Sequence, residues 1–467
     1  VTPSVDESPK VLPGPASETR GRKTWSIGTL TYTSAGLVAL FGWLLFGDFA
    51  WNLKERAAGP VAQLMLKGMG SSDLLVGLLV GSLPGALGML LGPIISVKSD
   101  RHRGRWGRRI PFLVIPTPIV MIGMVGMAFT PALGRMLHVA LGEASPGPQT
   151  ATLLVFVASW TCFEMATVVA NTIFSALIND VVPHELIGRF FGLFRAVSLL
   201  AGIIFNYWIF GYAETHYQAI FLGLGAAYGI GFMLMCLKVK EGDLPPAPEP
   251  GATSTTGGWK NIKTYIRECY SHPHYLWVFA AITFGLMAQG PVNAFGVFYA
   301  QSVNLSMADY GKYLALTYGF SLFCSYPLGY LSDRFHPLRV GITVMGIYTV
   351  VTLFGGFWAT TANAFAFFFV VHGILAGAYL TISSAMPPLL FPQAKFAQFF
   401  SAAGICTGIA HMVLPPIVGL GLDWSGHTYR YTFFGGSALG LIAMISFLIA
   451  YRNFNRLGGQ AGYVAPL

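Results

Sequence analysis

The chain has 467 residues, of which 54% are hydrophobic and 10% are charged, and its formal net charge is +9. Soluble domains carry about a quarter charged residues, so this composition excludes an ordinary soluble protein. Apolar stretches long enough to cross about 30 Å of hydrocarbon recur along the whole sequence. The sequence therefore predicts a protein that crosses a membrane many times.

The apolar stretches, taken in chain order, predict twelve transmembrane helices. Between the sixth and the seventh lies a Pro-, Gly- and Thr-rich linker, and its second part, WKNIKTYIRECY, has the pattern of a short amphipathic helix on the membrane surface. We expect the transmembrane helices near residues 30–53, 73–97, 110–130, 151–178, 187–212, 217–238, 275–299, 309–331, 339–358, 364–390, 396–422 and 431–451.

The predicted fold class is therefore an all-α membrane protein with twelve helices in two six-helix halves. The expected units are an N-terminal tail (1–28), an N-terminal bundle (29–238), a linker with the amphipathic helix (239–274), a C-terminal bundle (275–452) and a C-terminal tail (453–467).

The basic residues predict the orientation of these helices. If both termini are cytoplasmic, the tails and cytoplasmic connections carry 21 of the 28 Lys and Arg residues, the opposite side carries six, and Arg195 falls inside a helix. Such an excess is typical of cytoplasmic loops. We therefore expect a multi-pass protein of a cell (inner) membrane with both termini in the cytoplasm, and the positive charge reflects topology rather than nucleic-acid binding. The six residues assigned to the opposite side are Lys54, Arg56, Lys67, Arg135, Lys312 and Arg430.

Two short patterns repeat between the halves. Ser-Asp-Arg at 99–101 recurs at 332–334, and VPHELIGRFF at 182–191 matches FPQAKFAQFF at 391–400 in its Pro and its Phe pair. Two similar six-helix halves are typical of transporters that hold their substrate at the interface between the halves.

The loop at 98–109 reads KSDRHRGRWGRR, with six Lys or Arg among twelve residues. It resembles the signature between helices two and three of the major facilitator superfamily, and R-x-R-W-G-R-R-x-P-F is similar to the glycoside–pentoside–hexuronide:cation symporters and the sucrose transporters. The resemblance implies a cytoplasmic gate whose charge pairs form in one state and break in another; the alternative is that the loop only anchors the topology. The gate residues would be Asp100, Arg101, Arg105, Arg108, Arg109, Asp333 and Arg334.

Three ionisable residues fall within predicted helices: Asp48, Glu164 and Arg195. A charge at membrane depth is costly, so each is a candidate for function. FGDFAW around Asp48 resembles the melibiose-permease branch, which implies that Asp48 binds sugar hydroxyls; alternatively, it pairs with Lys54 or Arg56. The same branch implies that Arg195 and Asn171 contact the sugar.

Glu164 occupies the middle of the fourth helix. Together with Ala166, Ala176, Leu177 and Asp180 it keeps the spacing of the sucrose transporters, whose acid at this position couples transport to protons. The alternative is a structural ion pair with Arg195. Where those transporters carry an Arg before the Ala-Leu pair, this chain has Ser175, which argues against sucrose itself.

The second helix bears on the coupling ion. Sodium-using relatives carry two carboxylates at positions where this chain has Gly88 and Gly92. A hard cation needs several oxygen ligands, so we expect no metal site and proton coupling through Glu164. The second half contributes neutral polar residues to its helices: Gln289, Asn293, Tyr318, Tyr326, His372 and His411.

The leading hypothesis is a secondary transporter that moves a sugar or glycoside together with a proton, without any other cofactor, as a monomer in the bilayer. Alternatives are an organic-anion carrier with Arg195 as counter-charge, a sugar uniporter, a lysolipid carrier, or a membrane sensor that transports nothing. No enzyme motif is present, so we do not expect catalysis. The expected substrate-binding residues are Asp48, Asn171, Arg195, Trp160, Gln289 and Asn293.

Overall fold

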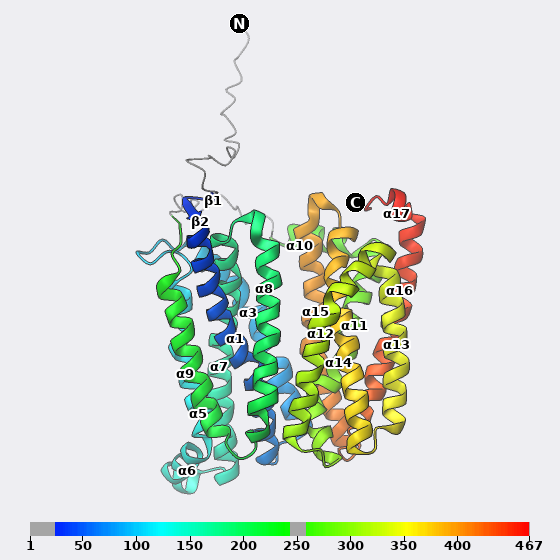
Figure 1. Ribbon diagram of the computed structural model, residues 1–467. Helices are drawn as coiled ribbons and strands as arrows, with labels where there is room; N and C mark the ends of the chain where they lie inside the picture. Colours follow the sequence, from blue (N-terminus) through cyan, green and yellow to red (C-terminus); the bar gives the residue numbers. More distant parts are fainter. Residues whose placement is uncertain (1–23, 243–257, 467) are drawn as a thin grey trace.

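The computed structural model describes residues 24–242 and 258–466. These residues form two bundles of long helices that stand side by side (Figure 1). The N-terminal half contains β1 (Thr24–Ile27), β2 (Leu30–Thr33), α1 (Ser34–Gly68), α2 (Asp73–Val76), the π-helical η1 (Gly77–Ser82), α3 (Leu83–Arg101), α4 (Pro111–Val114), α5 (Pro116–Ala128), α6 (Thr130–Leu141), η2 (Gly142–Ala144), α7 (Pro148–Val181), η3 (His184–Leu186), α8 (Ile187–Ile204), η4 (Phe205–Ile209), η5 (Phe210–Tyr212) and α9 (Tyr217–Lys238).

The C-terminal half follows a helix on the linker. Its elements are α10 (Gly258–Tyr270), α11 (Pro273–Ser302), α12 (Met307–Phe335), α13 (Pro337–Trp358), α14 (Ala362–Leu390), η6 (Gln393–Lys395), α15 (Phe396–Trp424), α16 (Tyr431–Arg456) and α17 (Gly459–Gly462). The β-hairpin, α10 and α17 lie at one end of the molecule, here called the terminal side, and α6 lies at the other end, the distal side (Figure 1).

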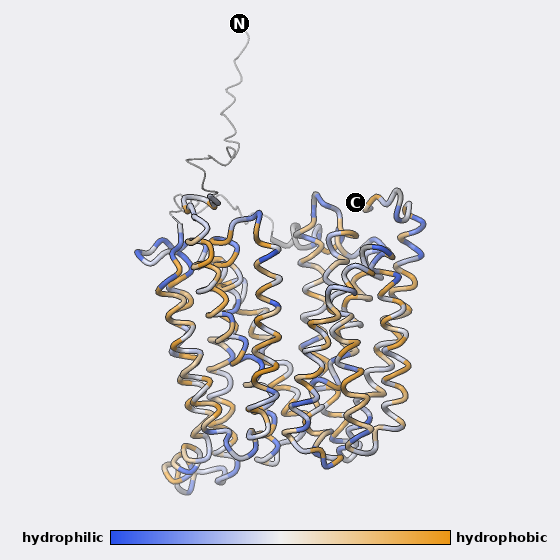
Figure 2. Tube along the Cα trace, in the orientation of Figure 1, coloured by the Kyte–Doolittle hydropathy of each residue, from blue (hydrophilic) through white to orange (hydrophobic). Residues whose placement is uncertain are grey.

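Eleven helical spans among the described residues are long and apolar enough to cross a membrane. The twelfth span, α12, is 29 residues long but more polar than the others. Hydrophobic residues dominate the middle of the long helices, and hydrophilic residues gather at both ends (Figure 2). Together these spans form the predicted all-α fold of two six-helix halves.

Side-chain caps fix where several helices begin. Thr33 Oγ1 accepts a hydrogen bond from the Gly36 amide at the start of α1, and Ser306 Oγ accepts one from the Asp309 amide at the start of α12. Such caps satisfy amide groups that have no partner within the helix. The helix predicted at 217–238 has these bounds in the structure, and WKNIKTYIRECY forms α10, as expected.

The first helix differs from the expectation in a way that matters for the site. It was expected to end near residue 53, but α1 continues to Gly68. Lys54 and Arg56 therefore lie in the middle of a membrane span, not in a loop on the opposite side as the charge count assumed. A hairpin of β1 and β2, in which Trp25 pairs with Tyr32, precedes α1 and was not expected from the sequence.

The repeat between the halves has a structural counterpart. Pro183 precedes the short 3-10 turn η3 and Pro392 precedes the matching turn η6, each at the start of the helix that follows. In both halves the Ser-Asp-Arg triplet lies in the last turns of a membrane span, α3 or α12.

Candidate functional site

A cavity of about 650 Å³ lies between the two halves. Its walls come from α1 and α8 of the N-terminal half and from α11, α12 and α14 of the C-terminal half, so both halves contribute to one site. The polar and charged residues that line it are Arg56, Gln63, Arg195, Ser198, Gln289, Asn293, Tyr310, Thr317, Tyr318, Ser321 and His372.

The halves are joined across the middle and the distal side. Gln63 Nε2 donates to the Ala294 carbonyl (3.1 Å), and Gln301 Nε2 donates to Glu214 (2.6 Å). Small residues allow close approach, since a Cβ atom added to Gly77 would lie 2.6 Å from the Pro415 carbonyl oxygen. Among the described residues, the hydrogen bonds between the halves all lie at the middle or distal side, while the ribbons diverge toward the terminal side (Figure 1). This conformation is therefore closed on the distal side.

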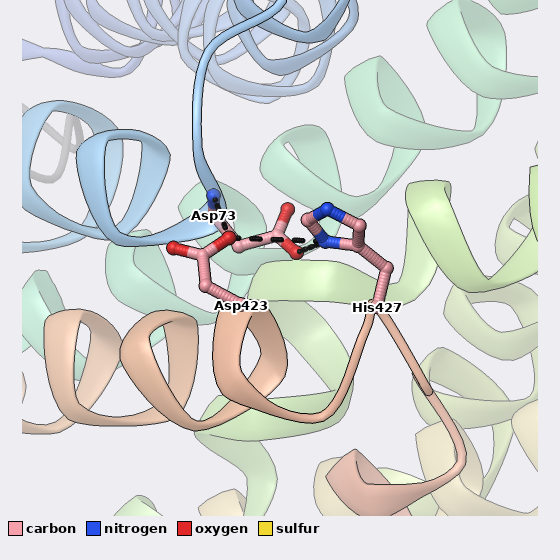
Figure 3. Close-up of side chains that lie close together, drawn as sticks. All are labelled: Asp73, Asp423 and His427. Atoms are coloured by element: carbon pink, nitrogen blue, oxygen red, sulfur yellow. Dashed lines mark hydrogen bonds and ion pairs between the residues drawn. The ribbon is translucent and has the colours of Figure 1, made fainter.

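A cluster of charged residues forms part of this distal closure. Asp73 starts α2 in the N-terminal half, and its carboxylate meets Lys67 Nζ (2.7 Å) and His427 Nδ1 (2.7 Å). Asp423, at the end of α15, accepts hydrogen bonds from the amides of Asp73 (2.8 Å) and Leu74 (2.9 Å). Figure 3 shows the three side chains of Asp73, Asp423 and His427 converging between the halves.

Arg56 is held at the cavity wall by a chain of hydrogen bonds. Its guanidinium donates to Ser198 Oγ (3.2 Å) and to the Tyr318 hydroxyl (3.4 Å). Ser198 Oγ donates to Asn52 Oδ1 (2.6 Å), and Asn52 Nδ2 donates to Asp48 Oδ1 (2.6 Å). Asp48 is fully buried and is therefore connected to the cavity through Asn52 and Ser198 rather than by lining it. Its other oxygen, Oδ2, has no hydrogen-bond partner among the described residues.

Arg195 lines the same cavity from α8 and is exposed to it. Among the described residues its guanidinium makes neither a hydrogen bond nor an ion pair, and the alternative pairing with Glu164 is absent from this conformation. The charged residues that line the cavity are Arg56 and Arg195, so the described walls carry positive charge.

Glu164 lies near the middle of α7 and is 7% exposed. The charges of Glu55 and Lys54, both on α1, act on its carboxylate. Lys54 is fully buried; its ammonium meets Glu55 (3.1 Å) and Thr167 (3.2 Å). Lys54 thus has one carboxylate, that of Glu55, within ion-pair distance.

Aromatic rings complete the surroundings of Lys54. Its Nζ lies 3.9 Å from the ring centre of Trp51, 5.0 Å from that of Phe163 and 5.3 Å from that of Tyr228. The faces of aromatic rings attract cations. The three rings therefore help to stabilise this ammonium in the apolar interior, where its carboxylate partner, Glu55, is itself half exposed.

The C-terminal half contributes neutral polar groups. Asn293 Oδ1 lies 3.2 Å from His372 Nε2, and His372 Nδ1 lies 3.0 Å from the Tyr348 hydroxyl, which donates to the Ala288 carbonyl. Gln289 and Asn293 line both the main cavity and a neighbouring one of about 360 Å³, which His411 also lines.

A family model described as the Major Facilitator Superfamily matches residues 44–323 and, in a second match, 278–459. The chain belongs to the major facilitator superfamily. Membership makes it a membrane transporter rather than an enzyme, as the sequence predicted. No match was found among curated proteins.

Solved transporters share the fold of this superfamily member at low sequence identity. A bacterial homolog of the human lysosomal transporter Spinster, inward-facing and unoccupied, is 17% identical with a TM-score of 0.63, over 90% of this chain and 97% of that one. A peptide transporter POT in complex with sulfate is 15% identical with a TM-score of 0.64, over 93% and 97%. A D-xylose-proton symporter is 15% identical with a TM-score of 0.61, over 88% and 96%. At these identities the likeness shows the fold alone.

Two residues expected to bind substrate lie away from the main cavity. Trp160 is buried in α7, where its indole Nε1 donates to the Leu79 carbonyl (2.8 Å) and its ring stacks on Phe156. Asn171 is exposed on the same helix and does not line the cavity. In this conformation neither residue lines the main cavity, and their contact with substrate stays a prediction. Arg195, Gln289 and Asn293 lie in the cavity, and their binding of substrate stays a prediction.

The basic loop forms an ion-pair cluster within the N-terminal half. Arg109 meets Asp100 (2.6 Å) and Asp180 (2.9 Å), and Arg108 meets Asp180 (2.6 Å). Glu241, after α9, accepts hydrogen bonds from three consecutive amides, those of residues 108, 109 and 110. The cluster thus ties together the ends of α3, α7 and α9 on the terminal side.

Three of the remaining predicted gate residues lie outside this cluster. Arg101 and Arg105 are exposed, and Arg334 lies over the ring of Phe335. Asp333 lies in α12, and its side chain falls outside the described residues. The gating role of the whole set stays a prediction.

The sequence did not single out Asn52, Glu55, Gln63 and Ser198, and it placed Lys54 and Arg56 on the opposite side of the membrane, as possible partners of Asp48. The run Lys-Glu-Arg at 54–56 looks like the polar end of a helix, because charged residues usually mark where an apolar span stops. The sequence nonetheless indicates that the helix continues, because the residues after Arg56 return to an apolar pattern up to Leu66.

Proposed function

We propose that this transporter carries a sugar or glycoside together with a proton by alternating access. The terminal side faces the cytoplasm in a bacterial-type inner membrane, in agreement with the sequence, which assigns 21 of the 28 basic residues to cytoplasmic tails and connections. No cofactor other than the coupling proton is part of the proposal, and the functional unit is a monomer.

The observation that carries the proposal is the cavity between the halves. Amide and hydroxyl side chains line it from both sides, including Gln63, Ser198, Gln289 and Asn293. Such groups donate and accept hydrogen bonds as sugar hydroxyls require. Because the halves are joined on the distal side, a substrate bound between them would leave toward the terminal side.

The charges around Lys54 support proton coupling. Lys54 forms an ion pair with Glu55, and the charges of both residues act on Glu164, so the three charges balance when one carboxylate carries a proton. Because an unbalanced charge in an apolar interior is costly, uptake and release of that proton would change the energy of this conformation. Glu164, buried where Glu55 is half exposed, is the proposed coupling site.

A second candidate is an organic anion, for example a sugar that carries a carboxylate. Arg56 and Arg195 are the charged residues that line the described cavity walls, and Arg195 has no partner among the described residues. An unpaired guanidinium binds carboxylates with two parallel hydrogen bonds. This arrangement favours a negative charge on the substrate.

A matched pair of substrates separates the two candidates. Proteoliposomes would be offered p-nitrophenyl glycosides and the corresponding glucuronides, with the proton gradient directed inward. Accumulation of neutral glycosides supports the first candidate, and accumulation of glucuronides alone, lost in Arg195→Gln, supports the second. If neither group accumulates, the assignment to glycosides is wrong.

A further inference from the structure

The cluster around Asp73 joins parts of the chain that lie about 350 residues apart, and we call it the distal clasp: Lys67, Asp73, Asp423, His427 and Tyr429. Lys67 and Asp73 belong to the N-terminal half and the other three to the C-terminal half. Asp73 is fully buried, whereas His427 is half exposed at the distal surface. The clasp is therefore within reach of protons from that side.

The backbone places His427 in an unusual position. After α15 ends at Trp424, Gly426 and His427 both adopt left-handed conformations, with φ of +67° and +61°. Such a φ is uncommon for a residue other than glycine and costs energy. The turn directs the imidazole back onto Asp73, where Nδ1 lies 2.7 Å from Oδ2, and within 3.7 Å of Asp423 (Figure 3).

The charges of the clasp balance only with a proton on His427. Asp73 and Asp423 bring two negative charges, and Lys67 brings one positive charge. Burial and the neighbouring Asp73 carboxylate raise the pKa of Tyr429, so its hydroxyl stays protonated and donates to Asp73. The net charge is therefore −1 with a neutral imidazole and zero with an imidazolium.

Two described groups beside the clasp do not enter this charge count. From α11, the apolar Phe298 faces Lys67, at 5.3 Å from its Nζ. Arg430, at the start of α16, lies over the ring of Tyr431 instead of entering the clasp.

The arrangement favours ion pairs over a metal centre, although the ligand-type atoms of Asp73, Asp423 and His427 lie within 4.8 Å of one another. The Asp73 carboxylate already contacts Lys67, whose ammonium would repel a metal cation. Both oxygens of Asp423 accept hydrogen bonds from the first amides of α2.

We propose that the distal clasp is a proton-operated latch: a proton on His427 holds the two halves together on the distal side, and its loss releases them. Histidine is the side chain that changes charge between pH 5 and pH 8. A ligand that binds one conformation better shifts the population toward it, and here that ligand is a proton. Protons arriving at the distal side would thus favour the conformation that opens toward the terminal side, independently of Glu164.

The test measures the distance between the halves, in the absence of substrate and with EDTA present to exclude metal ions. Spin labels would be attached to Met136→Cys in the N-terminal half and Thr360→Cys in the C-terminal half, both exposed on the distal side, after replacement of the native cysteines. Pulsed electron spin resonance on the full chain in lipid nanodiscs then gives the populations of distal-closed and distal-open states between pH 5 and pH 8.5.

We expect the ratio of closed to open states to fall at least about fivefold as the pH rises over this range, a typical size for coupling between a ligand and a conformation. His427→Gln keeps a hydrogen-bond donor but no charge, and should be more open at pH 5 and insensitive to pH. Asp423→Asn should also lose most of the dependence. His138→Gln and His216→Gln, at other distal histidines, should behave like the wild type.

Two results would overturn the proposal: populations of the wild type that do not change with pH, or a pH dependence in His427→Gln equal to that of the wild type. Because no substrate and no gradient enter the experiment, its outcome is independent of the proposed sugar symport.

Discussion

Arg56 and Tyr318 meet at the boundary between the two halves. The guanidinium Nη1 donates to the Tyr318 hydroxyl at 3.4 Å, and the guanidinium carbon lies 5.0 Å from the centre of the Tyr318 ring. Ser198 holds the other nitrogen, Nη2, at 3.2 Å. A positive charge is therefore fixed in the cavity wall by one residue from each half.

Tyr318→Phe should weaken substrate binding without abolishing transport. The ring still lies under the guanidinium, but one hydrogen bond is lost, at about 1 kcal/mol, or roughly a fivefold rise in KM with kcat nearly unchanged. Uptake kinetics would measure both constants. Tyr326→Phe, on the same helix and 86% exposed, serves as the control. Equal effects of the two changes would contradict a role for the Arg56 contact.

Lys54→Met should destabilise the protein, because it leaves Glu55 without its ion-pair partner and removes the positive charge that acts on Glu164. Removing one partner of a fully buried pair costs about 3–5 kcal/mol; Glu55 is half exposed, so we expect a cost of about 2 kcal/mol. Thermal unfolding followed by intrinsic fluorescence would show a lower Tm. Adding Glu164→Gln should restore part of the loss, and an unchanged or still lower Tm in the double variant would argue against charge balance at this site.

Gly77→Val should prevent closure on the distal side. A Cβ atom at this position would lie 2.6 Å from the Pro415 carbonyl oxygen, in the other half. We expect transport to fall more than about tenfold, because even a 1.4 kcal/mol bias against one state shifts its population tenfold. Gly88→Val, where a Cβ has nothing within 4 Å, is the matched control. Normal transport by Gly77→Val would show that the halves need not meet here.

Glu241→Ala should loosen the basic loop. The carboxylate accepts three consecutive backbone hydrogen bonds at 2.7–2.8 Å. Losing net stabilisation of about 1 kcal/mol should speed trypsin cleavage after Arg103 or Arg105 roughly fivefold. Glu185→Ala, an exposed carboxylate outside this cluster, should leave the rate unchanged. Equal rates for Glu241→Ala and the wild type would mean that other contacts hold the loop.

The sequence predicted the fold well, because hydropathy, loop charge and a repeated loop motif each depend on neighbouring residues. Arg195 and Gln289 were expected in the site because each is a polar or charged residue within a predicted membrane helix, and both line the cavity. The burial of Lys54 was not foreseen, because it depends on the rings of Trp51, Phe163 and Tyr228, which lie on three helices that only the fold brings together.

Contacts between residues that are distant in the sequence also explain the other differences between the expected and the observed site. Trp160 is a plausible sugar-stacking residue by type alone, but the partner of its indole, the Leu79 carbonyl, belongs to a different span. The distal clasp has no sequence pattern at all, since Asp73 and His427 lie 354 positions apart. Helix periodicity carries no information about such pairs.

The measurement that tests the account most directly is uptake of labelled glycosides and glucuronides into proteoliposomes, with and without an inward proton gradient, by the wild type and Glu164→Gln. Coupling through Glu164 predicts that the wild type accumulates a substrate above its external concentration only with the gradient. It also predicts that Glu164→Gln merely equilibrates the same substrate. Gradient-driven accumulation by Glu164→Gln at the wild-type level would contradict the account, as would equilibration that ignores the gradient in both proteins.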